Sequence, residues 1–243
     1  MQKEDFIKWA RKLQETYETS DALKARLAQV NLLAIVGPTG VGKTTIINQL
    51  DMPAVKSDVS RDMRHDEKND QNYHFREDYL QVLQEIKTGQ FAQFVVSDAG
   101  DFYGTHMNAY PESGWCSMAI FADAIPAFRE LGFKKVVPVY IMPPGYVEWM
   151  RRVGSQREHD LTSRIEEAIK SIKMALRDPE YHFVLNDNLE YAVRDVTRIV
   201  AGDPADEHRA RLARETADIL LERLGDQDDS IYFEPAGNAT PLS

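Results

Sequence analysis

The apolar positions of this chain fall into short continuous runs that alternate with amphipathic stretches. The run VNLLAIV at 30–36 is apolar almost throughout, and two further runs lie at 116–122 and 134–142. Strands buried on both faces of a parallel sheet have this pattern, because helices cover both sides of such a sheet. A shorter run, YHFVL at 181–185, predicts a fourth strand. The alternation therefore indicates an α/β core with a mostly parallel sheet flanked by helices.

Helical spacing marks the segments around these runs. An apolar stripe near the N-terminus is followed by Ser20, which can cap a second helix. Another apolar stripe predicts a helix at 76–88. In the segment 163–176, Ser163 and Glu166 have capping-box spacing, which predicts that this helix begins at Ser163. Further helices are expected near 188–201 and 204–224.

The same patterns divide the chain into parts. Residues 1–29 are expected to form a helical extension, and 30–201 the α/β domain. Within that domain the segment 54–105 is polar and rich in Arg, Asp and Tyr, so we interpret it as an inserted binding region. A C-terminal helix at 202–225 and a loose tail at 226–243 follow. The two flanking helices either pack on the core or form a dimer contact, so a homodimer is one expectation.

Composition narrows the classes of protein. A chain of 243 residues with 43% hydrophobic content can build one sizeable core. Its net charge of -10 argues against binding nucleic acid or membranes through net charge, and no apolar stretch approaches the roughly 20 residues of a membrane-spanning helix. The single cysteine, Cys116, excludes an intrachain disulfide, and the first residues lack the apolar core of a signal peptide. A cytoplasmic setting is therefore expected.

The strongest chemical signal follows the first strand. Residues 37–44, GPTGVGKT, satisfy every position of the Walker A pattern, between a predicted strand and a predicted helix. The glycines let several backbone N–H groups point at phosphate oxygens, while Lys43 can reach the β and γ phosphates and Thr44 can bind Mg²⁺. The sequence thus predicts a site for ATP and Mg²⁺. The residues expected to form it are Gly37, Pro38, Thr39, Gly40, Val41, Gly42, Lys43, Thr44 and Thr45.

Arginines and tyrosines downstream of this loop occur in an order that resembles the guanylate kinase family. The motifs are SDVSRDMR at 57–64, NYHF at 72–75 and FYGT at 102–105, and the resemblance extends to about residue 200. Two arginines three residues apart can converge on one phosphate, and tyrosine hydroxyls can complete its shell. Taken singly, these residues fit a solvated loop equally well. By resemblance, Arg61, Arg64, Tyr73 and Tyr103 bind the acceptor phosphate, and Ser57 and Thr105 lie near the base.

Two positions depart from the family. Gln93 stands where guanylate kinases usually place a glutamate that accepts hydrogen bonds from guanine, and an amide lacks the charge-assisted strength of a carboxylate. The family's aspartate pair at the end of the next strand is also missing, because Ala-Ile-Phe-Ala occupies 119–122. Asp98, Asp101 and Asp123 are the possible substitutes. These departures leave open an acceptor other than GMP, such as a modified deoxynucleotide or ribose 1,5-bisphosphate.

A polar stretch at 151–164 resembles the lid of guanylate kinases. Mobile guanidinium groups can neutralise the charge of a phosphoryl group in transfer and exclude water. By the same resemblance Asn186 lies near the adenine of the donor, although an Asn-Asp pair is equally a turn or a helix cap. The residues expected to be catalytic are Lys43, Arg152, Arg157 and Arg164.

These observations favour a P-loop kinase fold with an inserted acceptor-binding region and a lid. The leading hypothesis is an ATP-dependent nucleoside monophosphate kinase that acts on a small phosphorylated acceptor, with GMP or dGMP favoured. A non-catalytic guanylate-kinase-like module that binds a protein partner is one alternative, and its expected feature is a degraded phosphate loop. An NTPase switch or motor is another, and it should show an aspartate at the end of a hydrophobic strand.

Overall fold

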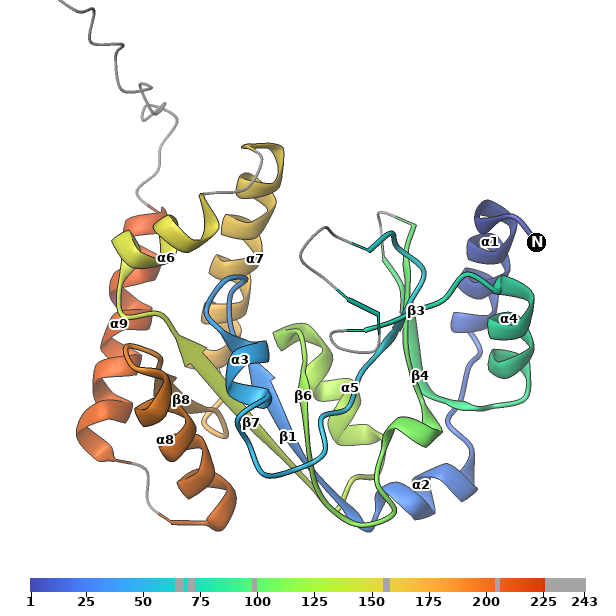
Figure 1. The fold of residues 1–243 in the computed structure, drawn as a ribbon, viewed down its shortest axis with the longest axis horizontal. Helices are drawn as coiled ribbons and strands as arrows, with labels where there is room; N and C mark the ends of the chain where they lie inside the picture. The colour runs from blue at the N-terminus through green and yellow to red at the C-terminus, as the bar shows by residue number, and fades with distance from the viewer. Residues whose placement is uncertain (64–67, 70–72, 98–99, 155–157, 204–205, 226–243) are drawn as a thin grey trace, which may run out of the picture.

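The computed structural model describes residues 1–63, 68–69, 73–97, 100–154, 158–203 and 206–225. Figure 1 shows two sheets with their helices, a larger unit that carries the C-terminal helices and a smaller one beside the N-terminal helix. The tail expected at 226–243 lies outside the described residues.

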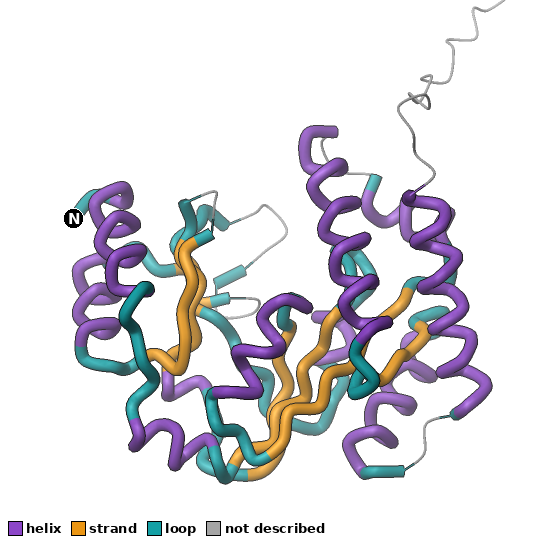
Figure 2. The backbone as a smooth tube through the Cα atoms, turned by 180° about the vertical axis from the view of Figure 1, so that it is seen from behind, coloured by secondary structure: helices purple, strands orange, loops and turns teal. Residues whose placement is uncertain are grey.

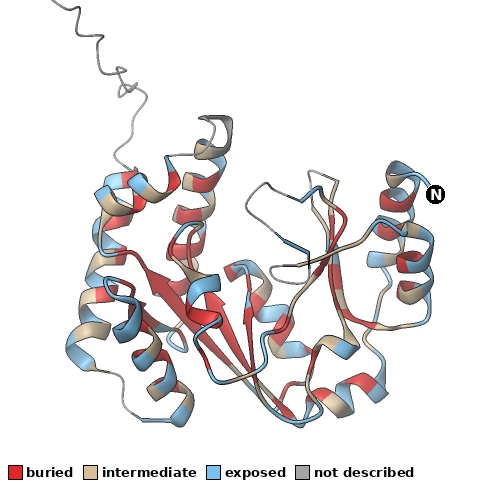
Figure 3. Ribbon diagram, viewed as in Figure 1, coloured by how far each residue is buried: buried red, intermediate tan, exposed pale blue. Residues whose placement is uncertain are grey.

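A four-stranded parallel sheet forms the core, and this confirms the fold class predicted from the apolar runs. The strand that precedes the Walker A motif lies inside the sheet, paired on both sides. Consecutive residues of this strand are buried, so helices cover both faces of the sheet (Figure 3). In spatial order the strands are β6 (Gly114–Ala119), β1 (Val30–Val36), β7 (Lys135–Met142) and β8 (His182–Leu185).

Helices pack around this sheet, and the last two cover the strand at its far edge (Figure 2). Within the described residues, no helix has both the length and the apolar character needed to cross a bilayer. The helices of this unit are α2 (Asp21–Leu27), α3 (Lys43–Ile47), α5 (Ile125–Glu130), α6 (Tyr146–Val153), α7 (Glu158–Arg177), α8 (Leu189–Ala201) and α9 (Glu207–Gly225), with the short 3-10 turns η1 (Met107–Ala109) and η2 (Ala122–Ala124).

Two helix starts test the capping signals of the sequence. The side chain of Ser20 accepts a hydrogen bond from the backbone N–H of Leu23, 3.3 Å away, so the predicted cap of α2 is confirmed. The predicted start at Ser163 is wrong, because α7 already includes Glu158 and Ser163 lies inside the helix. Leu161 packs against the core and extends the apolar stripe by about one turn beyond Ile165, which favours the earlier start.

The smaller sheet has mixed strand directions and its own apolar cluster. Two helices, one of them N-terminal, cover one face of it and bury Phe91, Phe94 and Phe102 of its strands. The residues of the predicted inserted region and of the predicted N-terminal extension therefore pack together. In spatial order the strands are β3 (His74–Phe75), β2 (Asp58–Val59), β5 (Phe102–His106) and β4 (Phe91–Val96), and the two helices are α1 (Lys3–Gln14) and α4 (Tyr79–Lys87).

The segment that follows α1 runs along β4, which is the last strand in the order of the smaller sheet. Tyr17 and Thr19 donate hydroxyl hydrogen bonds to the carbonyl oxygens of the first two residues of β4. The side-chain oxygen of Gln14 accepts a hydrogen bond from the backbone N–H of the last residue of β4, 2.7 Å away. Side chains thus pair polar groups that an edge strand leaves open.

Phe6 is the residue of α1 on which this packing depends most. Its ring is fully buried, stacks on Tyr79 with centroids 5.1 Å apart and meets the edge of Phe102 at 5.5 Å. We expect Phe6→Ala to lower the free energy of unfolding by about 3–5 kcal/mol, the usual cost of emptying a buried aromatic site. Urea denaturation followed by circular dichroism measures this.

Trp9→Ala is the matched control for this variant, because Trp9 lies on the same helix with 47% of its surface exposed. We expect Trp9→Ala to lower the free energy of unfolding by less than about 1 kcal/mol. Equal midpoints for Phe6→Ala and Trp9→Ala would contradict the packing of α1 on the smaller sheet.

Candidate active site

The Walker A loop joins β1 to α3 and can be built only with glycine at two points. Gly37 has a φ of 145°, and a Cβ placed on it would lie 2.5 Å from the carbonyl oxygen of Ile141. Gly42 has a φ of 94°, and its Cβ would lie 2.6 Å from the amide nitrogen of Asn186. Side chains at these positions would strain the backbone and collide with fixed neighbours. The loop is therefore pressed tightly against the ends of β7 and β8.

Two side chains from distant segments hold the loop from outside. The indole N–H of Trp149 on α6, which is fully buried, donates to the carbonyl oxygen of Thr39 at 2.9 Å. The side-chain amide of Asn186, at the end of β8, donates to the carbonyl oxygen of Val41 at 2.7 Å. No sequence pattern marks Trp149, and the family resemblance places Asn186 near the donor base. Both residues brace the loop in this structure.

Lys43 extends back into the loop from the first turn of α3. Its amino group donates to the carbonyl oxygens of Gly37 and Pro38, the latter at 3.0 Å. Burial lowers the pKa of Lys43 to about 8, and the negative charge of Glu167 on α7 opposes that shift. Thr44 and Thr45 follow on the exposed side of α3. The loop thus encloses the amino group of the half-buried Lys43, and two exposed threonines follow it.

A cavity of about 240 Å³ lies between this loop and the smaller sheet. Predicted site residues from five separate segments line it, and they are Gly37, Thr39, Lys43, Arg61, Tyr73, Tyr103 and Arg164. The other lining residues are Ala119, Ile120, Phe121, Ser163 and Glu167. Loop, smaller sheet and α7 therefore bring together a set of cations and phenols that lie far apart in the sequence.

Arg61 is held against aromatic rings on the acceptor side of this cavity. Its guanidinium carbon lies 5.0 Å from the ring centroid of Tyr73 and 5.3 Å from that of Phe75. Stacking of this kind orients the planar group, and its Nη1 donates to the carbonyl oxygen of Asp62 at 2.9 Å. Burial raises the pKa of the nearby Tyr103 hydroxyl, and the positive charge of Arg61 opposes that shift. Tyr103 is therefore neutral at physiological pH and can donate a hydrogen bond.

A second cavity of about 450 Å³ shares Tyr73, Tyr103 and Glu167 with the first. Its remaining walls are mostly apolar, with Ser57 and Gln93 among its few polar side chains. Flat, apolar walls with a small number of polar groups suit a nucleobase.

Gln93 and Thr105 are joined across β4 and β5. The side-chain nitrogen of Gln93 donates to the hydroxyl oxygen of Thr105 at 3.1 Å, and Thr105 is fully buried behind it. With the nitrogen engaged in this way, the side-chain oxygen of Gln93 is the atom able to accept a hydrogen bond from a base. Of the three residues predicted near the base, Ser57 and Gln93 line this cavity, and Thr105 orients Gln93.

The predicted lid arginines fall into three different places. Arg164 on α7 is buried and lines the phosphate cavity. Arg152 on α6 donates to Glu148 at 2.8 Å and is not among the residues that line the cavity. Hydrogen bonds from Arg151 and Arg152 lower the pKa of the exposed Glu148 to about 2. Arg64 and Arg157 lie outside the described residues.

Helix α9 fixes the turn that carries Asn186. Arg209 donates to the carboxylates of Asp187 and Asp195, each at 2.7 Å, and to the carbonyl oxygen of Leu185 at 2.9 Å. These contacts tie the end of β8 to α8 and α9, and through Asn186 they support the loop. Sequence spacing could not reveal this, because Arg209 follows Asp187 by 22 residues.

The end of β6 places no carboxylate in the phosphate cavity, as the missing aspartate pair of the sequence indicated. Asp101 pairs with Lys3 at 2.7 Å and lines neither cavity, whereas Asp123, which pairs with Lys170 at 2.7 Å, lines the second cavity. Asp98 lies outside the described residues. Of the described residues, the carboxylate that lines the phosphate cavity is Glu167, which the sequence analysis did not single out. An acidic residue in the middle of a helix carries no sequence signal of its own.

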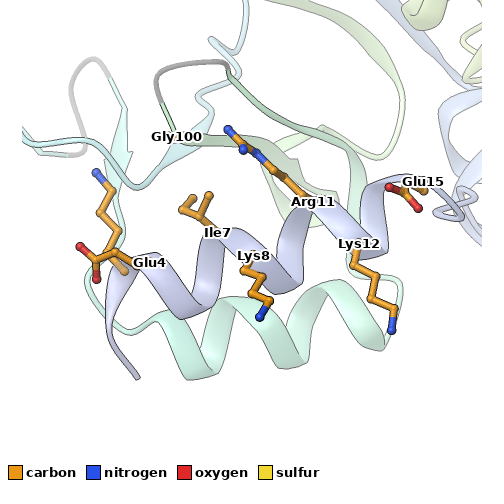
Figure 4. Close-up of a pocket in the computed structure, with 8 residues that line it drawn as sticks. Glu4, Ile7, Lys8, Arg11, Lys12, Glu15 and Gly100 are labelled. Atoms are coloured by element: carbon orange, nitrogen blue, oxygen red, sulfur yellow. The ribbon is translucent and has the colours of Figure 1, made fainter.

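A wider cavity of about 670 Å³ lies beside α1, away from the loop. Figure 4 shows Ile7 and Arg11 on the side of the helix that faces Gly100, while Lys8 and Lys12 point away from it. The backbone carbonyl of Ser97 accepts a hydrogen bond from Arg11 at 3.1 Å. This open surface groove mixes both signs of charge and lacks the convergent groups of the phosphate cavity.

Comparison with known proteins places most of this chain in one family of relatives. The family model described as guanylate kinase matches residues 29–202 of this chain. The guanylate kinase of Synechococcus sp. is 26% identical over 203 residues, which cover 76% of this chain and 89% of the relative. That of Thermotoga maritima is 28% identical over 186 residues, with 72% and 87% covered.

A solved structure supports the fold independently. The crystal structure of guanylate kinase from Anaplasma phagocytophilum superposes with a TM-score of 0.52 at 20% identity, and covers 75% of this chain and 90% of that one. Helices α1 and α9 lie outside the region that the family model matches, whereas the Walker A loop, both cavities and α7 lie within it. This chain therefore belongs to the guanylate kinase family.

Proposed function

We propose that this protein transfers the γ-phosphoryl group of ATP to a nucleoside monophosphate, with GMP or dGMP as the acceptor. Membership of the guanylate kinase family supports this reaction. One observation carries it for this chain: Lys43 and Arg61, from the donor loop and the acceptor region, line a single cavity. An intact loop also argues against a non-catalytic binding module, in which the phosphate residues would be degraded.

The residues of the loop fit ATP. At Gly37 and Gly42 the backbone has no room for a side chain, so its N–H groups form a close cradle for phosphate oxygens. Lys43 adds a buried positive charge, and Thr44 presents an exposed hydroxyl at the start of α3. Bound Mg²⁺ supplies charge neutralisation at the β and γ phosphates. We assign the donor to residues 37–45.

The acceptor fits the opposite wall. Arg61, Tyr73 and Tyr103 can bind its phosphate through a forked cation and two phenols. Its base fits the adjoining cavity, where Gln93, Ser57 and Asp123 are among the polar side chains. An oxygen of the acceptor phosphate then forms the new P–O bond as the bond between the γ-phosphorus and the β–γ bridging oxygen breaks, and ADP leaves.

In this proposal, electrostatic stabilisation of the transferring phosphoryl group supplies much of the rate enhancement. The transferring group carries negative charge on its equatorial oxygens, and Lys43 and Arg164 line the cavity where that charge develops. Positioning supplies the rest, because donor loop and acceptor wall hold the two reactants in one small space. No general base is required for this chemistry. We include Arg64, Arg152 and Arg157 as further candidates from the family resemblance.

Acceptor selectivity tests the proposal. A coupled assay of ADP release, run with Mg²⁺ and ATP, should show turnover that depends on GMP or dGMP and is much weaker with AMP. We expect Gln93→Glu to raise the preference for GMP over IMP about tenfold. A carboxylate accepts charge-assisted bonds from both guanine N–H groups, and IMP lacks the 2-amino group.

Gln90→Glu is the matched control. Gln90 lies just before β4, its side chain contacts Thr88 and His106, and it is not among the residues that line either cavity. Gln90→Glu should leave the preference for GMP over IMP unchanged. Absence of turnover with every acceptor, in a protein that binds ATP, would contradict the proposed function. An unchanged ratio in Gln93→Glu would contradict only the place of Gln93 at the base.

A further inference from the structure

The phosphate cavity contains one feature that a purely anion-binding site would avoid. Three cations line it, Lys43, Arg61 and Arg164, and among the described residues Glu167 is the acidic one. A carboxylate repels the phosphates that such a cavity receives, unless a further cation lies between them. Burial raises the pKa of Glu167, whereas the charge of Lys43 lowers it. The position of this carboxylate therefore calls for a physical reason.

The neighbouring strand suggests that reason. P-loop enzymes commonly hold Mg²⁺ with the hydroxyl of the loop Ser or Thr and with an aspartate at the end of an adjacent strand. Here the adjacent strand is β6, which pairs with β1. Its end carries Ala119, Ile120 and Phe121, none of which can bind a cation, and all three line the cavity together with Glu167. A carboxylate thus faces the end of β6 from another element.

Helix α7 is anchored at this point. Lys170 pairs with Asp123 of η2 at 2.7 Å, and the hydroxyl groups of Ser171 and Tyr140 are 2.7 Å apart. Both contacts lie one turn beyond Glu167 and join α7 to the turn after β6 and to β7. Glu167 therefore projects from a fixed helix rather than from a loop, as a preorganised ligand requires.

We propose that Glu167 supplies, from α7, the carboxylate of the Mg²⁺–nucleotide site that the end of β6 lacks. The inference rests on the proposed function, because it assumes that ATP binds with its metal at residues 37–45. Oxygen atoms suit Mg²⁺, which is usually held by one or two carboxylates together with phosphates and water. Thr44 and Glu167 would then be the protein's groups toward the ion.

The test compares nucleotide binding with and without metal, independently of turnover. The probe is the non-hydrolysable imido analogue of ATP, titrated by calorimetry into wild type and Glu167→Gln, once with Mg²⁺ and once with EDTA. We expect the variant to bind the Mg²⁺ complex about ten- to a hundredfold more weakly, the range typical of a lost metal-supporting group. The metal-free analogue should bind equally well or more tightly, because a repulsive charge has been removed.

A second readout follows the ion itself. Electron paramagnetic resonance of Mn²⁺ in the presence of the analogue should show a weaker ternary complex in Glu167→Gln. Glu166→Gln is the matched control, because Glu166 is adjacent, exposed and not among the residues that line the phosphate cavity. It should leave both affinities unchanged.

The outcomes separate the inference from the function on which it rests. Equal loss of affinity with and without metal would overturn the inference and leave Glu167 as a structural residue of α7. Unchanged binding of Mn²⁺ would overturn it as well. Opposite effects of the two titrations would support it, even if GMP proved not to be the acceptor. Failure of wild type to bind the analogue at all would instead refute the proposed function.

Discussion

Replacing Lys43 with alanine is expected to lower kcat/KM for phosphoryl transfer about a thousandfold or more. Its amino group is the buried cation inside the Walker A loop and lines the cavity between donor and acceptor walls. Removing one preorganised charge from a transition state costs on the order of a hundred- to a thousandfold, and a cation aimed at a transferring phosphoryl group costs more. Coupled ADP release with GMP as acceptor measures the loss.

Two further variants make the Lys43 result specific. Lys43→Met preserves the apolar stem, so its activity separates loss of charge from loss of packing, and its thermal unfolding should remain close to that of wild type. Lys173→Ala removes an exposed lysine of α7 and should retain full activity. Turnover of Lys43→Ala within tenfold of wild type would exclude the loop as the donor site.

The second large effect is expected at Arg61. Arg61→Met should raise the KM for the acceptor about a hundredfold and leave the affinity for ATP unchanged. The guanidinium is held over the rings of Tyr73 and Phe75 and lines the cavity, so methionine preserves the apolar stem and removes the charged, stacked fork. Steady-state kinetics with one substrate varied at a time separates the two constants.

Charge and geometry can be distinguished at the same position. Arg61→Lys keeps the positive charge and loses the planar fork, so it should fall between wild type and Arg61→Met. Arg211→Met, on the exposed face of α9, is the control and should have no effect on either constant. An equal rise in the KM for ATP and for the acceptor would mean that Arg61 does not belong to the acceptor wall.

Local signals in the sequence were sufficient for the core and the loop. The run that became β1 is buried at consecutive positions, which only a two-sided sheet produces, and the Walker A pattern needs no tertiary information. The cap at Ser20 was also predictable, because its hydrogen bond is made three residues away. Ser163 shows the limit of such signals: a capping pattern inside a helix is overruled when apolar contacts extend the helix beyond it.

The residues that hold the Walker A loop in place could not be predicted from local patterns. Trp149 reaches Thr39 across 110 residues, and Asn186 reaches Val41 across 145. Such contacts depend on how β7 and β8 lie beside the loop, and no periodicity encodes them. The position of Glu167 in the phosphate cavity likewise depends on how α7 packs near the end of β6. The sequence marks Gln93 as a departure from the family pattern, but its contact with Thr105 follows from the register of β4 and β5.

The covering of β4 by the start of the chain has a consequence for synthesis. Tyr17 bonds to a strand 74 residues further on, and Lys3 pairs with Asp101 across 98 residues. At translation rates of about 5–20 residues per second, α1 is synthesised several seconds before the strands on which it packs. During that interval the apolar face around Phe6 has nothing of its own to bury against. The apolar face of α1 is thus exposed until the strands of the smaller sheet have been synthesised.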